Sequence, residues 1–300
     1  MSASTGRKDH LDGLAVACVL ACCVLWGLNQ VAAKVALAEI PPLLQAAARS
    51  TGAALLVAAW SRARGIPLLA RDGTLAGGLA AGVLFAAEFG CIFVGLQYTT
   101  ASRMVVFIYL APFVVALGMP FIAATERLSL RRLAGLAGAV AGVAWAFAEG
   151  FSTPSGTELQ WVGDALGVAA AVLWGATTLV IRATRLSSAS AEKTLLYQLA
   201  VSGALLAAAA LLAGESWPDR LSAASLGPLA FQTVVVCFAS YLLWFWLIRH
   251  YPATPLSSFT LLTPISGLLA GVVLLSEPVT LRLIVALSAV AAGIAIVNRR

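Results

Sequence analysis

Charged residues are scarce in this sequence. Asp, Glu, Lys and Arg make up 11% of its 300 residues, whereas hydrophobic residues make up 61%. A soluble domain carries about 25% charged residues. The length would suit two soluble domains, but so few polar residues cannot cover a water-exposed surface. We therefore expect a protein whose solvent is the lipid bilayer.

Histidine and cysteine are also rare, and their positions disfavour catalytic and metal-binding classes. The two histidines, His10 and His250, lie far apart, and all five cysteines fall inside apolar stretches. No cysteine has the spacing of a metal ligand or of a disulfide framework. We expect buried cysteines that act as small hydrophobic residues, with no metal and no cofactor. A membrane-embedded enzyme would need clusters of His, Asp or Glu near one membrane face.

Other functional classes lack their sequence signals too. The chain has no Gly-x-x-x-x-Gly-Lys-Ser/Thr loop, so by itself it is not an ATP-driven pump. It has no filter loop or ring of charges, which disfavours a passive channel. The net charge of +6 comes from short loops between apolar runs. This pattern is typical of membrane topology and not of nucleic-acid binding.

Long hydrophobic runs, in contrast, are abundant. A membrane-spanning helix needs about 20 mostly apolar residues, and none of the runs shows the alternation of a barrel strand. We therefore predict an all-α polytopic membrane protein with ten transmembrane helices. The predicted spans are 12–37, 43–61, 74–97, 101–123, 131–149, 162–182, 192–214, 225–249, 254–275 and 280–298.

Three motifs recur at about half the chain length. They are Leu-Trp-Gly at 25–27 and 173–175, Phe-x-x-Leu-x-Pro at 107–112 and 259–264, and a Glu followed four residues later by Leu-Arg at 126–131 and 277–282. Such self-similarity indicates a duplicated unit. We predict a first five-helix repeat at 1–150 and a second at 151–300, which together form one transmembrane domain.

Because each predicted repeat has an odd number of helices, the two repeats must lie in opposite orientations. With a cytoplasmic N-terminus, 14 of the 19 Lys and Arg residues fall in cytoplasmic segments, as the positive-inside rule requires. The other five are predicted at the opposite membrane face: Lys34, Arg49, Arg103, Arg220 and Arg282. Inverted repeats commonly build secondary transporters. With ten helices, both termini are expected in the cytoplasm. A monomer would suffice, because one chain contains both repeats.

The paired motifs resemble those of the drug/metabolite transporter superfamily, EamA type, over essentially the whole chain. Each motif alone is weak, and the specific feature is the recurrence in both halves. Within the superfamily, the chain looks most like the YddG-type aromatic amino-acid exporters. The resemblance implies ten helices around a central cavity, a bacterial inner (cytoplasmic) membrane setting and export of small metabolites.

Two polar stripes contain candidate substrate-binding residues. Trp26, Asn29 and Gln30 lie on one helical face of the first span, and Trp174 and Thr178 occupy the corresponding face of the sixth. Polar side chains on a membrane helix should face protein or water, because lipid leaves their hydrogen bonds unmade. The alternative is structural, with interhelical hydrogen bonds for the polar residues and packing or an interfacial position for the tryptophans.

Glu88 is expected near the bilayer centre in the third span. A lone carboxylate there costs roughly 3 kcal/mol or more, so it must be protonated, paired or hydrated. We predict that it binds a cationic group of the substrate or a proton. The alternative is a protonated Glu that is hydrogen-bonded to a neighbouring helix.

Proline and aromatic residues complete the candidate site. Pro112 and Pro264 occupy matching places in the fourth and ninth spans. Each removes a backbone hydrogen bond and predicts a kink that acts as a gate; static shaping is the alternative. The remaining candidate substrate-binding residues, which would form an aromatic and weakly polar lining, are Phe107, Tyr241, Phe245 and Ser257. The alternative for the aromatic residues is ordinary packing.

The sequence therefore predicts a secondary transporter that exports small metabolites by alternating access, with aromatic amino acids as the first candidates. The alternative within the superfamily is a multidrug or cationic-compound exporter that uses Glu88 as its counter-charge. The expected partners are an amino acid or amphipathic amine as substrate and the lipid bilayer, with no nucleic acid.

Overall fold

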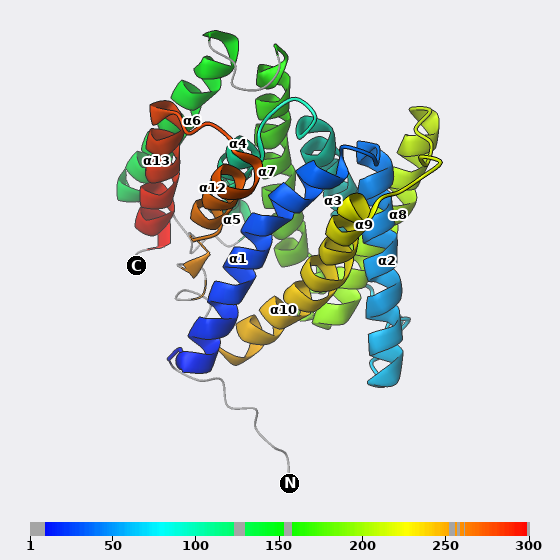
Figure 1. Ribbon diagram of the computed structural model, residues 1–300. Helices are drawn as coiled ribbons and strands as arrows, with labels where there is room; N and C mark the ends of the chain where they lie inside the picture. Colours follow the sequence, from blue (N-terminus) through cyan, green and yellow to red (C-terminus); the bar gives the residue numbers. More distant parts are fainter. Residues whose placement is uncertain are drawn as a thin grey trace.

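The computed structural model describes residues 10–122, 130–152, 158–251, 256, 259–260 and 262–298, and the elements in these ranges are helical (Figure 1). They form ten consecutive segments at the predicted places. The uninterrupted segments are α1 (Gly13–Ala36), α2 (Pro42–Ala63), α3 (Leu75–Gly95), α6 (Leu130–Ser152), α7 (Gln160–Ala183), α8 (Ala191–Leu212), α12 (Leu262–Leu275) and α13 (Leu281–Asn298). A short 3-10 turn, η1 (Arg185–Ser188), precedes α8.

Most of these helices suit a bilayer. In the described part of the chain, six segments are long and apolar enough to cross a membrane, and shorter apolar helices accompany them. The segment α2 is not among the six, because polar residues such as Gln45 and Arg49 interrupt its apolar sequence. The protein is therefore a multi-pass membrane protein with one unusually polar helix.

Two of the ten segments are interrupted. The fourth consists of α4 (Ala101–Ile108) and α5 (Ala111–Ile122), which a turn at Tyr109–Leu110 separates directly before Pro112. The eighth consists of α9 (Ala223–Ala230), η2 (Phe231–Ser240) and α10 (Tyr241–His250). Here η2 is a π-helix, a conformation that occurs frequently at functional sites.

The helix α4 lies at the centre of the bundle. All eight of its residues are buried, and it packs against α1, α7, α12 and α13. Met104 and Phe107 of α4 belong to the main hydrophobic core. In a lipid bilayer, the burial of α4 stabilises the bundle through close packing and not through removal of apolar surface from water. The shape of α4 therefore determines how the surrounding helices meet.

Helices of the two halves pack across each other (Figure 1). The first helix of the chain, α1, lies along α12, and the first helix of the second half, α7, lies along α5 and α4. In addition α2 packs on α8, and α6 packs on α13. If the two halves are exchanged, the pair α1–α12 becomes the pair α7–α5, and the pairs α2–α8 and α6–α13 become themselves. This symmetry is the pattern expected of a duplicated unit.

The glycine of the repeated Leu-Trp-Gly motif lies at each of the first two crossings. A Cβ added to Gly27 would lie 2.6 Å from the backbone nitrogen of Gly267 on α12. A Cβ added to Gly175 would lie 2.5 Å from Cβ of Val114 on α5. Ordinary contacts between carbon atoms are about 3.5–4.0 Å. Glycine therefore permits a backbone approach that any side chain would prevent.

Acidic residues between the helices fasten one half to the other. Glu215, which follows α8, accepts a hydrogen bond from the backbone N–H of Leu44 in the first turn of α2 at 2.8 Å. Asp72, which precedes α3, pairs with the Lys193 ammonium of α8 at 2.8 Å. Hydrogen bonds from Lys193 and from the Thr74 hydroxyl hold the pKa of Asp72 well below its usual range. Both carboxylates thus connect an element of the first half to an element of the second half.

Replacing Gly27 by alanine should destabilise the protein, because the new methyl group meets backbone atoms of α12 that cannot rotate away. Overpacking of this kind costs about 1–3 kcal/mol, which thermal unfolding in detergent would detect. Gly138→Ala on α6 is the matched control, since a Cβ there meets no atom within 4 Å and alanine is the better helix former. Equal melting temperatures for the two variants would contradict the close crossing.

Candidate functional site

A buried carboxylate lies inside the bundle. Glu88 of α3 is 5% exposed, and its Oε2 has no hydrogen-bond partner. Arg49 of α2 and Tyr241 of α10 lie close enough to interact with it electrostatically. Burying a charged group without a hydrogen-bonded partner is costly. This carboxylate is therefore available to a proton or to a cationic ligand group.

Arg49 is a buried cation, and the positive-inside rule predicts its position wrongly. The positive-inside pattern predicts it at a membrane face, whereas the structure buries it in α2 at 0% exposure. Its Nε, Nη1 and Nη2 have no hydrogen-bond partner. The guanidinium lies over the Phe89 ring, 4.0 Å from the centroid, with the Phe93 ring at 5.2 Å. The sequence contains one signal for this burial, which is Pro42. A proline commonly begins a helix, and a helix that begins at Pro42 places Arg49 two turns inside α2.

The tryptophan of the first motif lies beside the start of α10. Trp26 Nε1 donates to Ser240 Oγ at 2.9 Å, and its ring packs edge-on against Tyr241 with centroids 6.4 Å apart. Tyr241 in turn interacts electrostatically with Arg49 and Glu88. The structure thus brings three of the predicted residues, Trp26, Glu88 and Tyr241, together with Arg49.

The corresponding tryptophan of the second half reaches the same region through Tyr109. This tyrosine lies in the break between α4 and α5 and is 4% exposed. Its ring packs edge-on against Trp174, with centroids 5.7 Å apart, and it interacts electrostatically with Tyr241. The interruption before Pro112 thus connects Trp174 to Tyr241, which in turn packs against Trp26.

The two polar stripes behave differently. Asn29 and Gln30 are 5% and 4% exposed, and their side-chain oxygens have no hydrogen-bond partner. They are therefore free acceptors within about one turn of Trp26. In the second stripe, Thr178 Oγ1 donates to the backbone oxygen of Trp174 within α7 at 3.1 Å. That bond within the helix agrees with the structural alternative for Thr178.

The other predicted residues lie in the core or at helix ends. Phe107 is fully buried and packs edge-on against Phe147, with centroids 6.3 Å apart. Phe245 is half-buried against the same core. These contacts agree with the packing alternative. Pro264 lies in the first turn of α12, and Ser257 lies outside the described residues.

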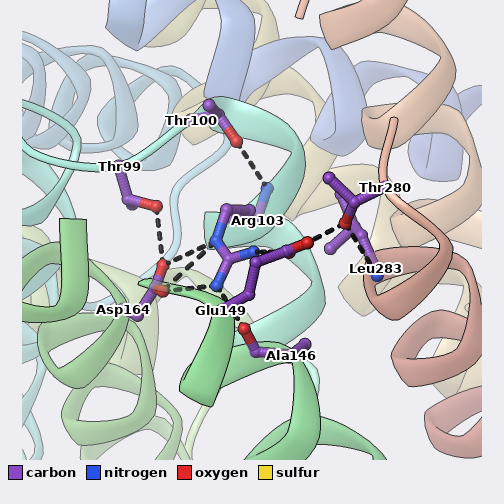
Figure 2. Close-up of polar contacts among 8 residues, drawn as sticks. All are labelled: Thr99, Thr100, Arg103, Ala146, Glu149, Asp164, Thr280 and Leu283. Carbon is purple, nitrogen blue, oxygen red and sulfur yellow. Dashed lines mark hydrogen bonds and ion pairs between the residues drawn. The ribbon is translucent and has the colours of Figure 1, made fainter. Parts of the chain in front are cut away.

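A second buried arginine is fully paired (Figure 2). Arg103 of α4 donates from Nη1 to Glu149 at 2.8 Å and from Nη2 to Asp164 at 2.6 Å. Thr99 donates to Asp164 at 2.6 Å, and Thr280 donates to Glu149 at 2.8 Å. The network joins the starts of α4, α7 and α13 to the end of α6. Such charge-assisted bonds are about twice as strong as neutral ones.

Two more contacts fasten this end of the bundle. Glu277, in the turn before α13, accepts hydrogen bonds from the backbone N–H groups of Ala101 at 2.7 Å and Ser102 at 2.9 Å. It thereby caps α4, where a carboxylate suits the exposed N–H groups. Lys34, at the end of α1, donates to the backbone oxygen of Thr99 at 2.6 Å. We call the Arg103 network, Glu277 and Lys34 the clamped end.

Comparison with known proteins identifies the family. The sequence pattern of the EamA-like transporter family matches residues 13–148 and again residues 161–299. The chain belongs to the EamA-like transporter family. The two matched stretches correspond closely to the two halves that the repeated motifs define.

Relatives of this EamA-like transporter are similar over different lengths. The uncharacterized transporter YvbV of Bacillus subtilis is 26% identical over 282 residues, which cover 92% of this chain and 89% of YvbV. An uncharacterized transporter of Archaeoglobus fulgidus is 37% identical over 75 residues, or 25% of this chain and 27% of that protein. A solved crystal structure aligns with a TM-score of 0.65 at 20% identity and covers 97% of this chain and 96% of that one. That last likeness concerns the fold alone.

The groups that the fold gathers in this EamA-like transporter suit non-covalent binding. Arg49 offers a guanidinium and Glu88 a carboxyl group, and Trp26, Tyr109 and Tyr241 offer aromatic surface. Small-molecule sites typically combine apolar and aromatic walls with a few polar groups that fix orientation. Among the described residues, no group of His, Cys, Asp and Glu could hold a metal ion.

Replacing Arg103 by glutamine should destabilise the protein strongly, because Glu149 and Asp164 would remain buried without their cation. Removing one partner of a buried ion pair costs about 3–5 kcal/mol. Arg62→Gln is the matched control, since Arg62 is exposed near the end of α2. Thermal or denaturant unfolding in detergent measures the difference. A stability equal to that of the control would show that the network does not hold the clamped end together.

Proposed function

We propose that this EamA-like transporter is a secondary carrier that exports small metabolites, with aromatic amino acids as its substrates. The observation that carries the proposal is Glu88, a buried carboxylate with an unpartnered Oε2. Ionisable residues within membrane helices mark substrate or ion pathways. A substrate ammonium group would pair with this carboxylate and offset the cost of its burial.

The aromatic residues near Glu88 support an aromatic substrate. Trp26 packs edge-on against Tyr241, and Trp174 packs edge-on against Tyr109. Such aromatic pairs contribute about 0.5–1.5 kcal/mol beyond the area that they bury, and a substrate ring would add to the same set of contacts. Asn29 and Gln30, on the helical face of Trp26, offer oxygen acceptors to an indole N–H or to an ammonium group.

In this proposal the carrier works by alternating access. Two similar halves in opposite orientations exchange conformations, so the site opens to one side and then to the other. The clamped end must separate in one of these states. We place that end at the periplasmic face of the inner membrane, with both termini in the cytoplasm, because 14 of 19 basic residues then face the cytoplasm. Crosslinks that place both halves in parallel orientation would contradict this arrangement.

A cationic-compound exporter is the second candidate function. The observation that favours it is again Glu88. Its Oε2 has no hydrogen-bond partner, as expected of a carboxylate whose cationic ligand has not yet bound. Arg49 disfavours a cationic substrate, because the guanidinium interacts electrostatically with Glu88 and would repel a second cation. The two candidates therefore differ in whether the substrate carries a negative charge of its own.

Purified protein in proteoliposomes should take up radiolabelled tryptophan and phenylalanine in a saturable manner, and more rapidly than alanine or an organic dication. The measurement is made with and without an imposed proton gradient, since gradient dependence separates coupled from facilitated transport. Uptake of the dication alone would replace the first candidate function by the second. Uptake no greater than that of empty liposomes would contradict both.

Replacing Glu88 by glutamine should lower tryptophan uptake about 10-fold to 100-fold, because a hydrogen bond to a charged group contributes about 1.5–3 kcal/mol. The matched control is Glu158→Gln, since Glu158 lies in an exposed turn before α7. Initial uptake rates at equal amounts of reconstituted protein give the comparison. Rates that do not differ between the two variants would remove Glu88 from the site.

A further inference from the structure

We propose that Arg49 binds the carboxylate of the transported molecule, so that the substrate must carry a carboxylate as well as an ammonium group. The inference rests on the proposed transport function, because it specifies the substrate class of the same site. It assigns one charge of a zwitterion to each of two buried residues: the carboxylate to Arg49 and the ammonium to Glu88.

Arg49 and Arg103 are both buried but differ in their partners. Arg103 and Arg49 are 1% and 0% exposed. Arg103 has two carboxylates and a backbone oxygen as partners, whereas Nε, Nη1 and Nη2 of Arg49 have none. A buried charge without a partner is strongly unfavourable. Arg103 shows how this protein satisfies a structural arginine, whereas no carboxylate and no backbone oxygen accepts a hydrogen bond from Arg49.

The Arg49 guanidinium lies beside two aromatic rings. Its carbon lies 4.0 Å from the centre of the Phe89 ring and 5.2 Å from that of Phe93. A cation above an aromatic face gains about 0.5–2 kcal/mol, and this contact stabilises the guanidinium without supplying a negative charge. The Arg49 nitrogens still form no hydrogen bond in the structure. A planar N–H edge is the geometry that binds a carboxylate through two parallel hydrogen bonds.

Arg49 and Glu88 lie at a similar depth in the bundle. Arg49 lies seven residues after the start of α2, and Glu88 lies seven residues before the end of α3. Because consecutive helices in a bundle run in opposite directions, both residues lie about 10 Å inside the same end. Their charges interact, yet the Arg49 nitrogens form no hydrogen bond to Glu88. Two opposite charges at one depth match the two charges of a zwitterion.

The groups nearest to Arg49 do not replace a carboxylate. Cys237 of η2 and Tyr241 of α10 interact electrostatically with the guanidinium. Both are neutral groups, so the hydrogen bonds that the Cys237 thiol and the Tyr241 hydroxyl can accept from the guanidinium bring no negative charge. A carboxylate from the substrate would supply the missing negative charge. It would also leave Glu88 to the substrate ammonium, so that the occupied site is neutral overall.

The experiment compares three molecules that share an indole ring and differ in charge. Tryptophan carries both charges, tryptamine lacks the carboxylate, and indole-3-propionate lacks the ammonium. Each competes with radiolabelled tryptophan for uptake into proteoliposomes that contain wild-type protein, Arg49→Gln, Arg49→Lys or the exposed control Arg62→Gln. We expect wild-type protein and the control to prefer tryptophan at least about 10-fold over either analogue, because each lost charged contact removes about 1.5–3 kcal/mol.

In Arg49→Gln the preference between tryptophan and tryptamine should disappear or reverse. Tryptophan loses its carboxylate partner, while tryptamine is freed from repulsion by the guanidinium. Arg49→Lys should be intermediate, because lysine retains the charge but not the planar pair of donors. Arg49→Lys also serves as the test if Arg49→Gln does not fold. A purely structural role would instead lower uptake without changing the ratio of the two affinities.

Two outcomes would overturn the inference. One is an unchanged preference for tryptophan over tryptamine in the Arg49 variants. The other is equal affinity for both molecules in wild-type protein. If wild-type protein transports no aromatic amino acid, the proposed function fails, and thermal stabilisation in detergent by a panel of amino acids and their decarboxylated amines decides the inference separately. Stabilisation by amino acids that depends on Arg49 would support it, and its absence would contradict it.

Discussion

A charge buried in a lipid-solvated bundle must find a partner, and this protein meets the requirement in two ways. Arg103 is neutralised inside the protein by Glu149 and Asp164, so its network joins four helix ends and needs nothing further. Arg49 and Glu88 are buried as deeply but have unpartnered atoms. The first arrangement gives stability, and we propose that the second forms a site that a ligand completes.

The glycine crossings favour the two-state movement that the proposed alternating access requires. At Gly27 and Gly175, the first helix of each half approaches the fourth segment of the other half so closely that a methyl group would not fit. These contacts tie α1 to α12 and α7 to α5. The break at Tyr109 lies between them and separates α4 from α5. A closely packed interface with a discrete break favours two distinct arrangements over continuous deformation.

Hydrophobic runs and repeated motifs were sufficient to predict the helical segments, because length and periodicity are local properties of the sequence. Glu88 could be found for the same reason, as a lone carboxylate in an apolar run. Arg49 could not be found by counting charges, since that rule treats every arginine as a loop residue, and its burial depends on where α2 begins. The packing of Phe107 against Phe147 depends on which face of α4 meets its neighbours. That is a tertiary property, which no local pattern contains.

The proximity of Arg49 to Glu88 also bears on the energy of transport. Moving one elementary charge across a membrane potential of 100 mV changes its free energy by about 2.3 kcal/mol. A cation bound only by Glu88 would be drawn inward by an inside-negative potential, so its export would require coupling to another gradient. A zwitterion held between the two residues carries no net charge, and the potential neither drives nor opposes its movement. For such a substrate, export down a concentration gradient requires only a carrier that opens alternately to each side.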